Sequence, residues 1–459
     1  MVISWLTSSI ASAVGTPVES VYLMMCLLLS YPIAVIYNQL LVDASRQTKL
    51  LYYLISGMTL VLINNGLNIV HSLAVCLQCY ATIRWCPIRT ALVINVVVPM
   101  VYLLYGCHIT QIGSIYTIGW TLPQCVLTLR LIAVTFDVYD GQRNAATLKK
   151  SDNNHKQEND VILLNLDTAI PTVPTLIEFL SHCYFPYTIL VGPLISYNKY
   201  MSYIKSQESH ISHSYVPALG RLAAGLVYLY VYVIGCVYWP QEYLLTHEFE
   251  GSDFMWKITA VAIVCKIGMT KYLASWLISE GSCILSGISW DGKSYYTCAN
   301  IYVWKFETTP TFDGVIKSFN LSTNSFAAKY LFKRFKFLGN RMASQSLTLI
   351  FLAIWHGLST GYYVTFLMEF LIMKMEMDVL AKVAKKRNKS PKLDSLLNSY
   401  FVKMFIWIVF RIYTIYLLGY SFMPFMHLQY PTWYHIYSQV YWYGHVIVGT
   451  WIIISAFVV

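Results

Sequence analysis

His356 is the residue whose type and setting point most clearly to chemistry. It lies in a long apolar run around Trp355-His356-Gly357 that is otherwise fit to span a bilayer. Ionisable side chains at that depth are rare and often functional. A neutral imidazole can take the proton of an attacking hydroxyl, the general-base task in acyl transfer from a thioester. A histidine that is hydrogen-bonded inside a helical bundle is the alternative, and composition alone leaves both open.

Asn320 and Asn324 lie upstream of this histidine and are residues that could work with it. A neutral amide can donate to a developing oxyanion, or orient a substrate, without bringing a charge into a low dielectric. Asn320-Leu321-Ser322 is also formally an N-glycosylation sequon, which requires an exposed lumenal loop. The basic residues that follow favour the cytosolic side instead.

Composition places these residues in a membrane protein. Of the 459 residues, 57% are hydrophobic and 12% charged, and the mean hydropathy is +0.52, which excludes a soluble globular protein. The apolar runs are long rather than alternating, so helices must satisfy the backbone and a barrel is excluded. The sequence therefore predicts an all-α polytopic bundle, one domain over residues 1–459, with about ten to twelve spans and re-entrant segments around a catalytic chamber.

Each predicted span is near the twenty or so residues that a bilayer requires. Residues 72–85 and 281–305 are too short or too broken for spans, so we expect re-entrant or interfacial segments there. No internal repeat is evident. The predicted spans are 18–41, 51–73, 90–110, 115–137, 173–195, 220–239, 255–279, 345–375, 400–424 and 436–459.

The net charge of +10 is concentrated in short polar loops, which indicates membrane orientation rather than nucleic-acid binding. Residues 138–165, 329–341 and 382–392 are the basic loops, and the positive-inside rule assigns all three to the cytosol. The middle loop separates Asn320 from His356. Its basic side chains could meet the phosphates of coenzyme A, or act only in topology: Lys333, Arg334 and Lys336.

The eleven cysteines are scattered, many of them in apolar runs, without paired motifs of the kind that hold zinc. Cys76-Leu-Gln-Cys79 is a lone pair without partner ligands, so we expect these thiols to pack as small apolar groups. The sequence predicts no metal site and no nucleic-acid partner.

Several motifs together resemble the membrane-bound O-acyltransferase family, within it the animal lysophospholipid acyltransferases. They extend over most of the chain and are specific at the subfamily level. The motifs are Gln124-Cys-Val-Leu-Thr-Leu-Arg130, Phe136-Asp-Val-Tyr-Asp-Gly141, Val191-Gly-Pro-Leu194, Cys298 to Phe312, Phe319-Asn-Leu-Ser-Thr-Asn324, Lys333-Arg-Phe-Lys-Phe-Leu-Gly-Asn340 and Trp355-His-Gly357.

The resemblance implies that His356 is the catalytic base and Asn320 the second active-site residue. Asn324 is the alternative partner of the histidine and a candidate for binding substrate. It implies acyl transfer from acyl-CoA to the sn-2 hydroxyl of a lysophospholipid, without a cofactor. It further implies lysophosphatidylcholine as acceptor, polyunsaturated acyl chains, and phospholipid remodelling (the Lands cycle) in the endoplasmic reticulum. The chain ends in an apolar run without a dilysine signal, so we expect retention there to depend on another feature.

Aromatic residues near these positions are candidates for binding substrate. Trp304, Tyr362 and Tyr363 could line a passage for the acyl group or thioester, and Trp355 adjoins the histidine. Aromatic residues make up 15% of the chain, so core or belt packing is the default for any one of them.

Charged residues in predicted spans need partners. Arg130 should pair with a carboxylate, Asp137 or Asp140, or bind a substrate phosphate. Glu369 follows His356 by several turns and cannot orient the imidazole if one helix continues through both, so we expect a structural role.

The catalytic motifs that the sequence lacks favour one mechanism and leave alternative functions open. Neither a Gly-x-Ser-x-Gly elbow nor a cysteine beside His356 is present, so direct attack of the acceptor on the thioester is the simplest mechanism. A family member that acylates a sterol, a diacylglycerol or a protein is one alternative. A lipid transporter or scramblase with His356 in its pathway is another, although acidic relays and repeats are missing. The chain is expected as a monomer or homodimer among membrane lipids.

Overall fold

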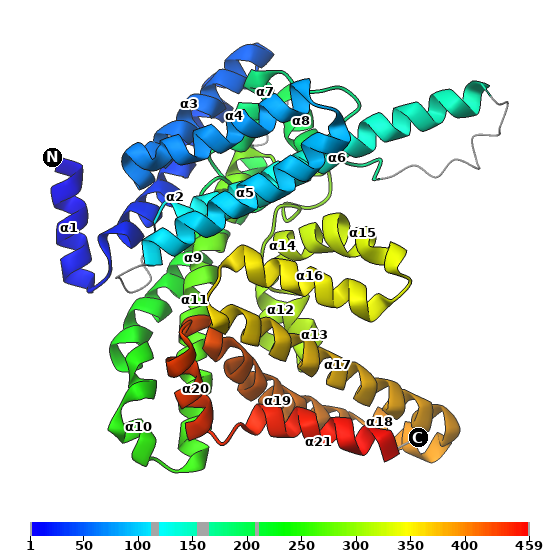
Figure 1. Ribbon diagram of the computed structural model, residues 1–459. Helices are drawn as coiled ribbons and strands as arrows, with labels where there is room; N and C mark the ends of the chain where they lie inside the picture. The colour runs from blue at the N-terminus through cyan, green and yellow to red at the C-terminus, as the bar shows by residue number, and fades with distance from the viewer. Residues whose placement is uncertain (1, 112–118, 154–164, 207–210, 458–459) are drawn as a thin grey trace. The chain divides into compact units, whose positions relative to one another are not determined.

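The computed structural model describes residues 2–111, 119–153, 165–206 and 211–457 (Figure 1). These residues form helices joined by turns and irregular segments, and their one β-bridge pairs Ile301 with Phe319. The prediction of an all-α, polytopic membrane protein is confirmed.

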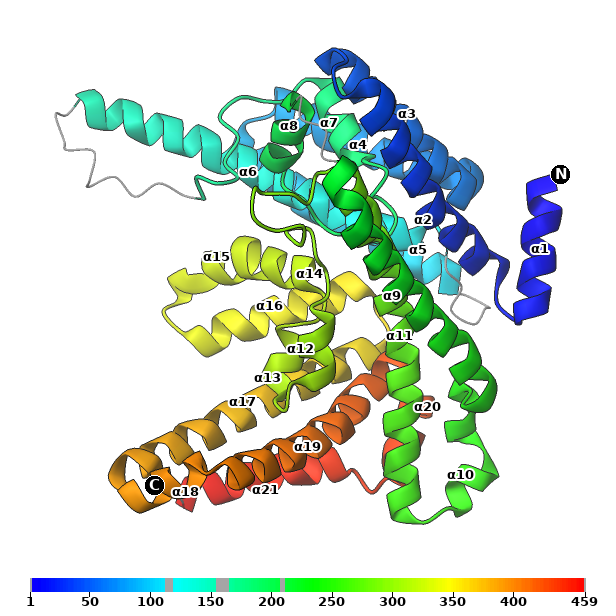
Figure 2. The ribbon, with the colours of Figure 1, turned by 180° about the vertical axis from the view of Figure 1, so that it is seen from behind.

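The described helices are distributed along the whole chain, and Figure 2 shows them from behind. They are α1 (Val2–Val14), α2 (Val18–Ile36), α3 (Arg46–Asn65), α4 (Ile69–Trp85), α5 (Ile88–Gln111), α6 (Thr121–Asn153), α7 (Leu176–Cys183), α8 (Tyr197–Lys205), α9 (Ile211–Tyr238), α10 (His247–Gly251), α11 (Phe254–Ser286), α12 (Val303–Thr308), α13 (Phe312–Ile316), α14 (Leu321–Phe326), α15 (Lys333–Phe335), α16 (Arg341–His356), α17 (Thr360–Lys389), α18 (Pro391–Asn398), α19 (Tyr400–Met426), α20 (Tyr430–Gln439) and α21 (Tyr443–Phe457).

Two compact units divide the chain, and each is built from several stretches of sequence. Unit 1 comprises Met1–Leu226, Ala274–Asn300 and Ser325–Leu331, and unit 2 comprises Val227–Leu273, Ile301–Asn324 and Phe332–Val459. The units interleave in sequence, so they are not two successive domains. The single-domain organisation stays a prediction.

Seven helices of the described residues are long and apolar enough to cross a membrane. They overlap seven of the ten predicted spans, so the apolar runs there do form long helices. The seven are Val18–Leu41, Arg46–Trp85, Ile88–Thr110, Thr121–Thr147, Ser214–Leu245, Phe254–Ser286 and Tyr400–Met426.

The other three predicted spans are not continuous helices. Residues 173–195 contain only the short helix α7, followed by turns. Residues 345–375 are broken by Gly357, whose φ of 137° ends α16. Residues 436–459 are broken between α20 and α21, where Tyr441 and Trp442 have positive φ. An apolar composition cannot reveal such breaks, because hydropathy averages over them.

One of the two segments predicted to be irregular differs from that prediction in the structure. Residues 72–85 lie in the regular helix α4, where Cys76 and Cys79 are buried, so the expected re-entrant segment is wrong. Residues 281–305 fit better, because α11 ends at Ser286 and turns follow.

The three basic loops are largely helical: α6 continues to residue 153, short helices occupy most of 329–341, and α17 and α18 cover most of 382–392. Lys156 lies outside the described residues.

Arg130 is 1% exposed on α6 in unit 1, and its predicted pairing with a carboxylate is wrong. Asp137 instead accepts from the hydroxyls of Thr168 and Tyr330, each at 2.8 Å. The Arg130 guanidinium bonds oxygen atoms at the end of α7 and in the turn after it: the carbonyls of His182 (2.9 Å), Cys183 (2.7 Å) and Thr188 (3.1 Å), and the Thr188 hydroxyl (2.7 Å). Arg130 therefore organises the turn after α7 and has no geometry for binding a substrate phosphate.

Replacing Arg130 with lysine tests this structural role. Lysine keeps the charge, but its ammonium has no planar fork with which to make all four contacts. We expect Arg130→Lys to lower stability by on the order of 3 kcal/mol, since charge-assisted bonds to a buried turn are lost. The measurement is thermal unfolding in detergent. Arg143→Lys, at an exposed position of the same helix, is the control, and equal melting of both variants would contradict the assignment.

Candidate active site

His356 lies at the tip of a helical hairpin in unit 2. It is the last residue of α16, and α17 begins four residues later and packs back along α16 (Figure 1). Gly357 permits the reversal because its φ of 137° is unfavourable for any residue with a Cβ. Gly361 lets α17 approach α19 closely, since a Cβ there would collide with the carbonyl oxygen of Pro424. These two glycines thus shape a turn and a helix contact.

Aromatic rings surround the imidazole of His356. Ring centroids lie 4.4 Å away for Trp355, 5.5 Å for Tyr362, 5.5 Å for Phe366 and 5.0 Å for Phe425. In the part of the chain that the structure describes, no protein group forms a hydrogen bond with the imidazole. The alternative, a histidine hydrogen-bonded inside the bundle, is therefore not supported there. Its nitrogens are available to a substrate.

Asn320 occupies a strained turn of the same unit, between α13 and α14. Its φ is 51°, in the left-handed region that asparagine tolerates better than most side chains. The turn is braced by the bridge between Ile301 and Phe319 and by a bond from the Tyr302 N–H to the Ser318 carbonyl, at 2.9 Å. Among the described residues no protein group bonds the Asn320 side chain, which leaves its amide free to meet a ligand.

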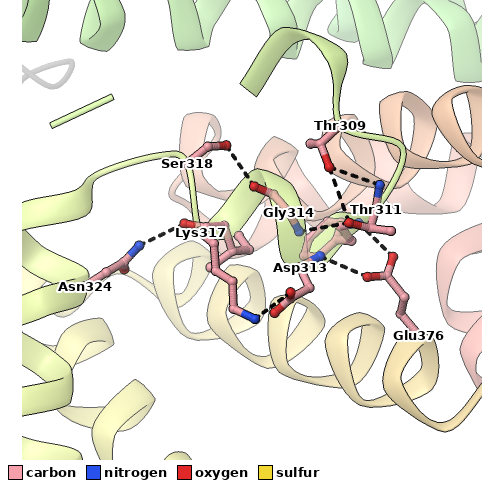
Figure 3. Close-up of polar contacts among 10 residues, drawn as sticks. Thr309, Thr311, Asp313, Gly314, Lys317, Ser318, Asn324 and Glu376 are labelled. Carbon is pink, nitrogen blue, oxygen red and sulfur yellow. Dashed lines mark hydrogen bonds and ion pairs between the residues drawn. The ribbon is translucent and has the colours of Figure 1, made fainter. Parts of the chain in front are cut away.

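Asn324 is committed to holding this turn. Its side-chain amide donates to the carbonyl oxygens of Ile316 (2.8 Å) and Phe319 (2.9 Å), as Figure 3 shows in part. Both donors of the amide are used, so the geometry favours a structural role for Asn324 and leaves Asn320 as the available amide.

The structure distributes the other predicted substrate residues unevenly. Trp355 and Tyr362 are buried against His356, whereas Tyr363 is half-buried on α17. Trp304, on α12, is 81% exposed and has no packed surroundings. Arg130 belongs to unit 1, whereas His356 and Asn320 share unit 2.

The basic residues proposed for coenzyme A lie on short helical turns of unit 2 between α14 and α16. Lys333 and Lys336 are exposed and Arg334 is half-buried. Lysine and arginine side chains in such positions can reach phosphate groups in water.

The sequence analysis missed three residues that shape the site. Phe366 and Phe425 complete the ring of aromatic contacts, but Phe is too common here for one to stand out. Glu376 follows Glu369 by two turns of an apolar helix and anchors α13, as detailed below. A carboxylate within an apolar helix is the signal that could have revealed it. The Glu369 carboxylate makes no hydrogen bond within the described chain, and its structural role stays a prediction.

Comparison with known proteins agrees with the geometry. The sequence model of the MBOAT family, the membrane-bound O-acyltransferases, matches residues 104–421. The chain belongs to this family, which confirms the resemblance.

Alignments with similar proteins cover most of this chain. The chain is 35% identical over 450 residues to lysophospholipid acyltransferase 5 of Mus musculus, covering 96% of this chain and 89% of the relative. It is 32% identical over 456 residues to lysophospholipid acyltransferase 5 of Drosophila melanogaster, covering 97% and 88%. It is 26% identical over 375 residues to a lysophospholipid acyltransferase of Saccharomyces cerevisiae, covering 72% and 56%.

Gly357→Ala tests whether the helix break positions His356. A Cβ at this φ imposes strain of about 1–3 kcal/mol, which the turn can relieve by moving the histidine. We expect a lower melting temperature and an acyl-transfer rate reduced more than tenfold, since catalysis is sensitive to small displacements. Gly251→Ala, where a Cβ meets nothing within 4 Å, is the control. Normal activity of Gly357→Ala would show that the break is not required.

Proposed function

We propose that this protein moves a fatty acyl group from acyl-CoA to the sn-2 hydroxyl of a lysophospholipid. The observation that carries the proposal is one compact unit that presents the His356 imidazole within aromatic rings and the Asn320 amide on a strained turn, both without protein partners among the described residues. The relatives are lysophospholipid acyltransferases, which supports this substrate class. Lysophosphatidylcholine as acceptor and polyunsaturated acyl chains are the preferences we propose, and the endoplasmic reticulum is the membrane.

His356 acts as the general base in this proposal. Its apolar surroundings favour the neutral imidazole, which can accept the proton of the sn-2 hydroxyl as oxygen attacks the thioester carbonyl. The aromatic enclosure also limits water, which would otherwise compete as a nucleophile. When the tetrahedral intermediate collapses, the C–S bond breaks and the ester is formed. The coenzyme A thiolate leaves and takes up the proton from the His356 imidazolium, which restores the neutral base.

Asn320 stabilises the oxygen that becomes negatively charged on the thioester carbonyl. A fixed amide donor is effective here because its dipole needs no reorganisation during the reaction, and it adds no charge to an apolar site. The left-handed turn holds the amide in place before substrate binds.

An assay with labelled acyl-CoA tests both residues and the acceptor class. Purified protein is offered a panel of lysophospholipids, a sterol and a diacylglycerol. We expect transfer to lysophospholipid, a loss of about a hundredfold or more in His356→Ala because the base is removed, and a loss of about a hundredfold in Asn320→Ala because the oxyanion donor is removed.

Matched variants separate chemistry from folding. His247→Ala replaces an exposed histidine and Asn398→Ala a surface asparagine, and both should keep the wild-type rate. Acylation of sterol or diacylglycerol alone would assign another branch of the family. If folded protein transfers no acyl group to any acceptor, the transporter alternative is favoured, and full activity of His356→Ala would eliminate this base.

Coenzyme A recognition is proposed for Lys333, Arg334 and Lys336. We expect the triple alanine variant to raise KM for acyl-CoA about fivefold at low salt while kcat changes little, because an electrostatic attraction is lost. The difference should shrink as ionic strength rises.

The matched control replaces Lys385, Lys386 and Lys389, which are exposed at the end of α17. An equal rise in KM for the control variant would mean that general positive charge, rather than the Lys333–Lys336 segment, attracts the thioester.

A further inference from the structure

Glu376 of α17 is a carboxylate buried without a basic partner. It is 2% exposed, and within the described chain no lysine, arginine or histidine forms an ion pair with it. Its two oxygens instead accept backbone N–H groups of α13, from Phe312 at 2.7 Å and from Asp313 at 3.0 Å (Figure 3). Burial of a charge is costly unless it is compensated, so these two bonds hold α13 tightly against α17.

α13, the helix to which Glu376 is bonded, leads directly into the turn that contains Asn320. Ser318 is fully buried, and its hydroxyl donates to the carbonyls of Gly314 and Val315 at 2.8 and 2.9 Å. Asn324 closes the other side through its bonds to Ile316 and Phe319. Between these ties Asn320 has little freedom to move relative to α13.

The helix that carries Glu376 also contributes to the surroundings of His356. Tyr362 and Phe366, near the start of α17, contact the imidazole ring. From Tyr362 to Glu376 the helix is continuous, so the two positions are held about 21 Å apart along its axis. The first turns of α17 thus contact the histidine, and the middle of the same helix holds α13, which precedes the Asn320 turn.

We propose that Glu376 is a positioning residue for acyl transfer: by anchoring α13 it fixes the Asn320 amide in the unit that holds His356. It touches no substrate in this account, and the inference rests on the acyltransferase function proposed above. A second set of ties, from Arg411 to the Thr309 carbonyl (2.9 Å) and from Thr414 to the Pro310 carbonyl (2.6 Å), joins the preceding segment to α19. These ties should keep the unit folded when Glu376 is changed.

The test is Glu376→Gln, which keeps the side-chain volume but leaves one acceptor oxygen and turns an NH2 group toward a backbone N–H. We expect kcat to fall about tenfold to a hundredfold, because Asn320 is displaced by a fraction of an ångström. KM for both substrates should stay within about twofold, since no binding contact is removed. Asp378→Asn, on the same turn of α17 and without a hydrogen bond among the described residues, should behave as wild type.

A double-mutant cycle with Asn320→Ala distinguishes positioning from general destabilisation. If Glu376 acts through Asn320, Glu376→Gln should lower the residual rate of Asn320→Ala less than twofold, because the group that it positions is already gone. The same fold-loss in both backgrounds, or no loss in wild type, would overturn the inference.

Glu376→Asp keeps both acceptor oxygens on a shorter arm, so its kcat should fall between those of wild type and Glu376→Gln. A kcat below that of Glu376→Gln would contradict the role of the two bonds. An inactive wild-type protein would count against the proposed function itself, which separates that failure from failure of this inference.

Discussion

The site depends on one constraint: the polar groups of an irregular backbone segment inside an apolar helical unit must find hydrogen-bond partners. The segment from α12 to α14 cannot satisfy its own N–H and carbonyl groups as a long helix does, and exposing them to hydrocarbon would cost several kcal/mol each. Side chains supply the missing partners: Glu376 for the first turn of α13, and Asn324, Arg411 and Thr414 for carbonyls. These contacts convert a segment that would be unstable alone into a rigid platform for Asn320.

The same principle explains how His356 is presented. A continuous helix would bury the histidine along its side, whereas the break at Gly357 places it at the end of α16, where α17 and α19 bring aromatic rings around it. Close approach at Gly361 fixes α17 against the end of α19. The two helices that form this contact also bind the Asn320 platform, so the positions of base and oxyanion donor are set by shared elements.

Sequence patterns predicted the parts that depend on composition and local chemistry. Seven spans and the membrane class followed from apolar runs, and the family followed from motifs. The catalytic roles of His356 and Asn320 stay predictions. The break at Gly357 was missed because hydropathy averages across a turn. The partners of Arg130 were missed because a guanidinium can also bind backbone carbonyls, whose positions depend on the fold. Glu376 and Phe425 act through contacts between segments far apart in sequence, which no local pattern encodes.

The most direct test of the account is a structure of the protein with a non-hydrolysable acyl-CoA analogue and a lysophospholipid bound together. The account predicts the sn-2 hydroxyl within about 3.2 Å of an imidazole nitrogen of His356, with the Asn320 amide a similar distance from the carbonyl oxygen of the analogue. Substrates bound with their reacting atoms away from both residues, in a complex shown to be competent for transfer with the native thioester, would contradict it.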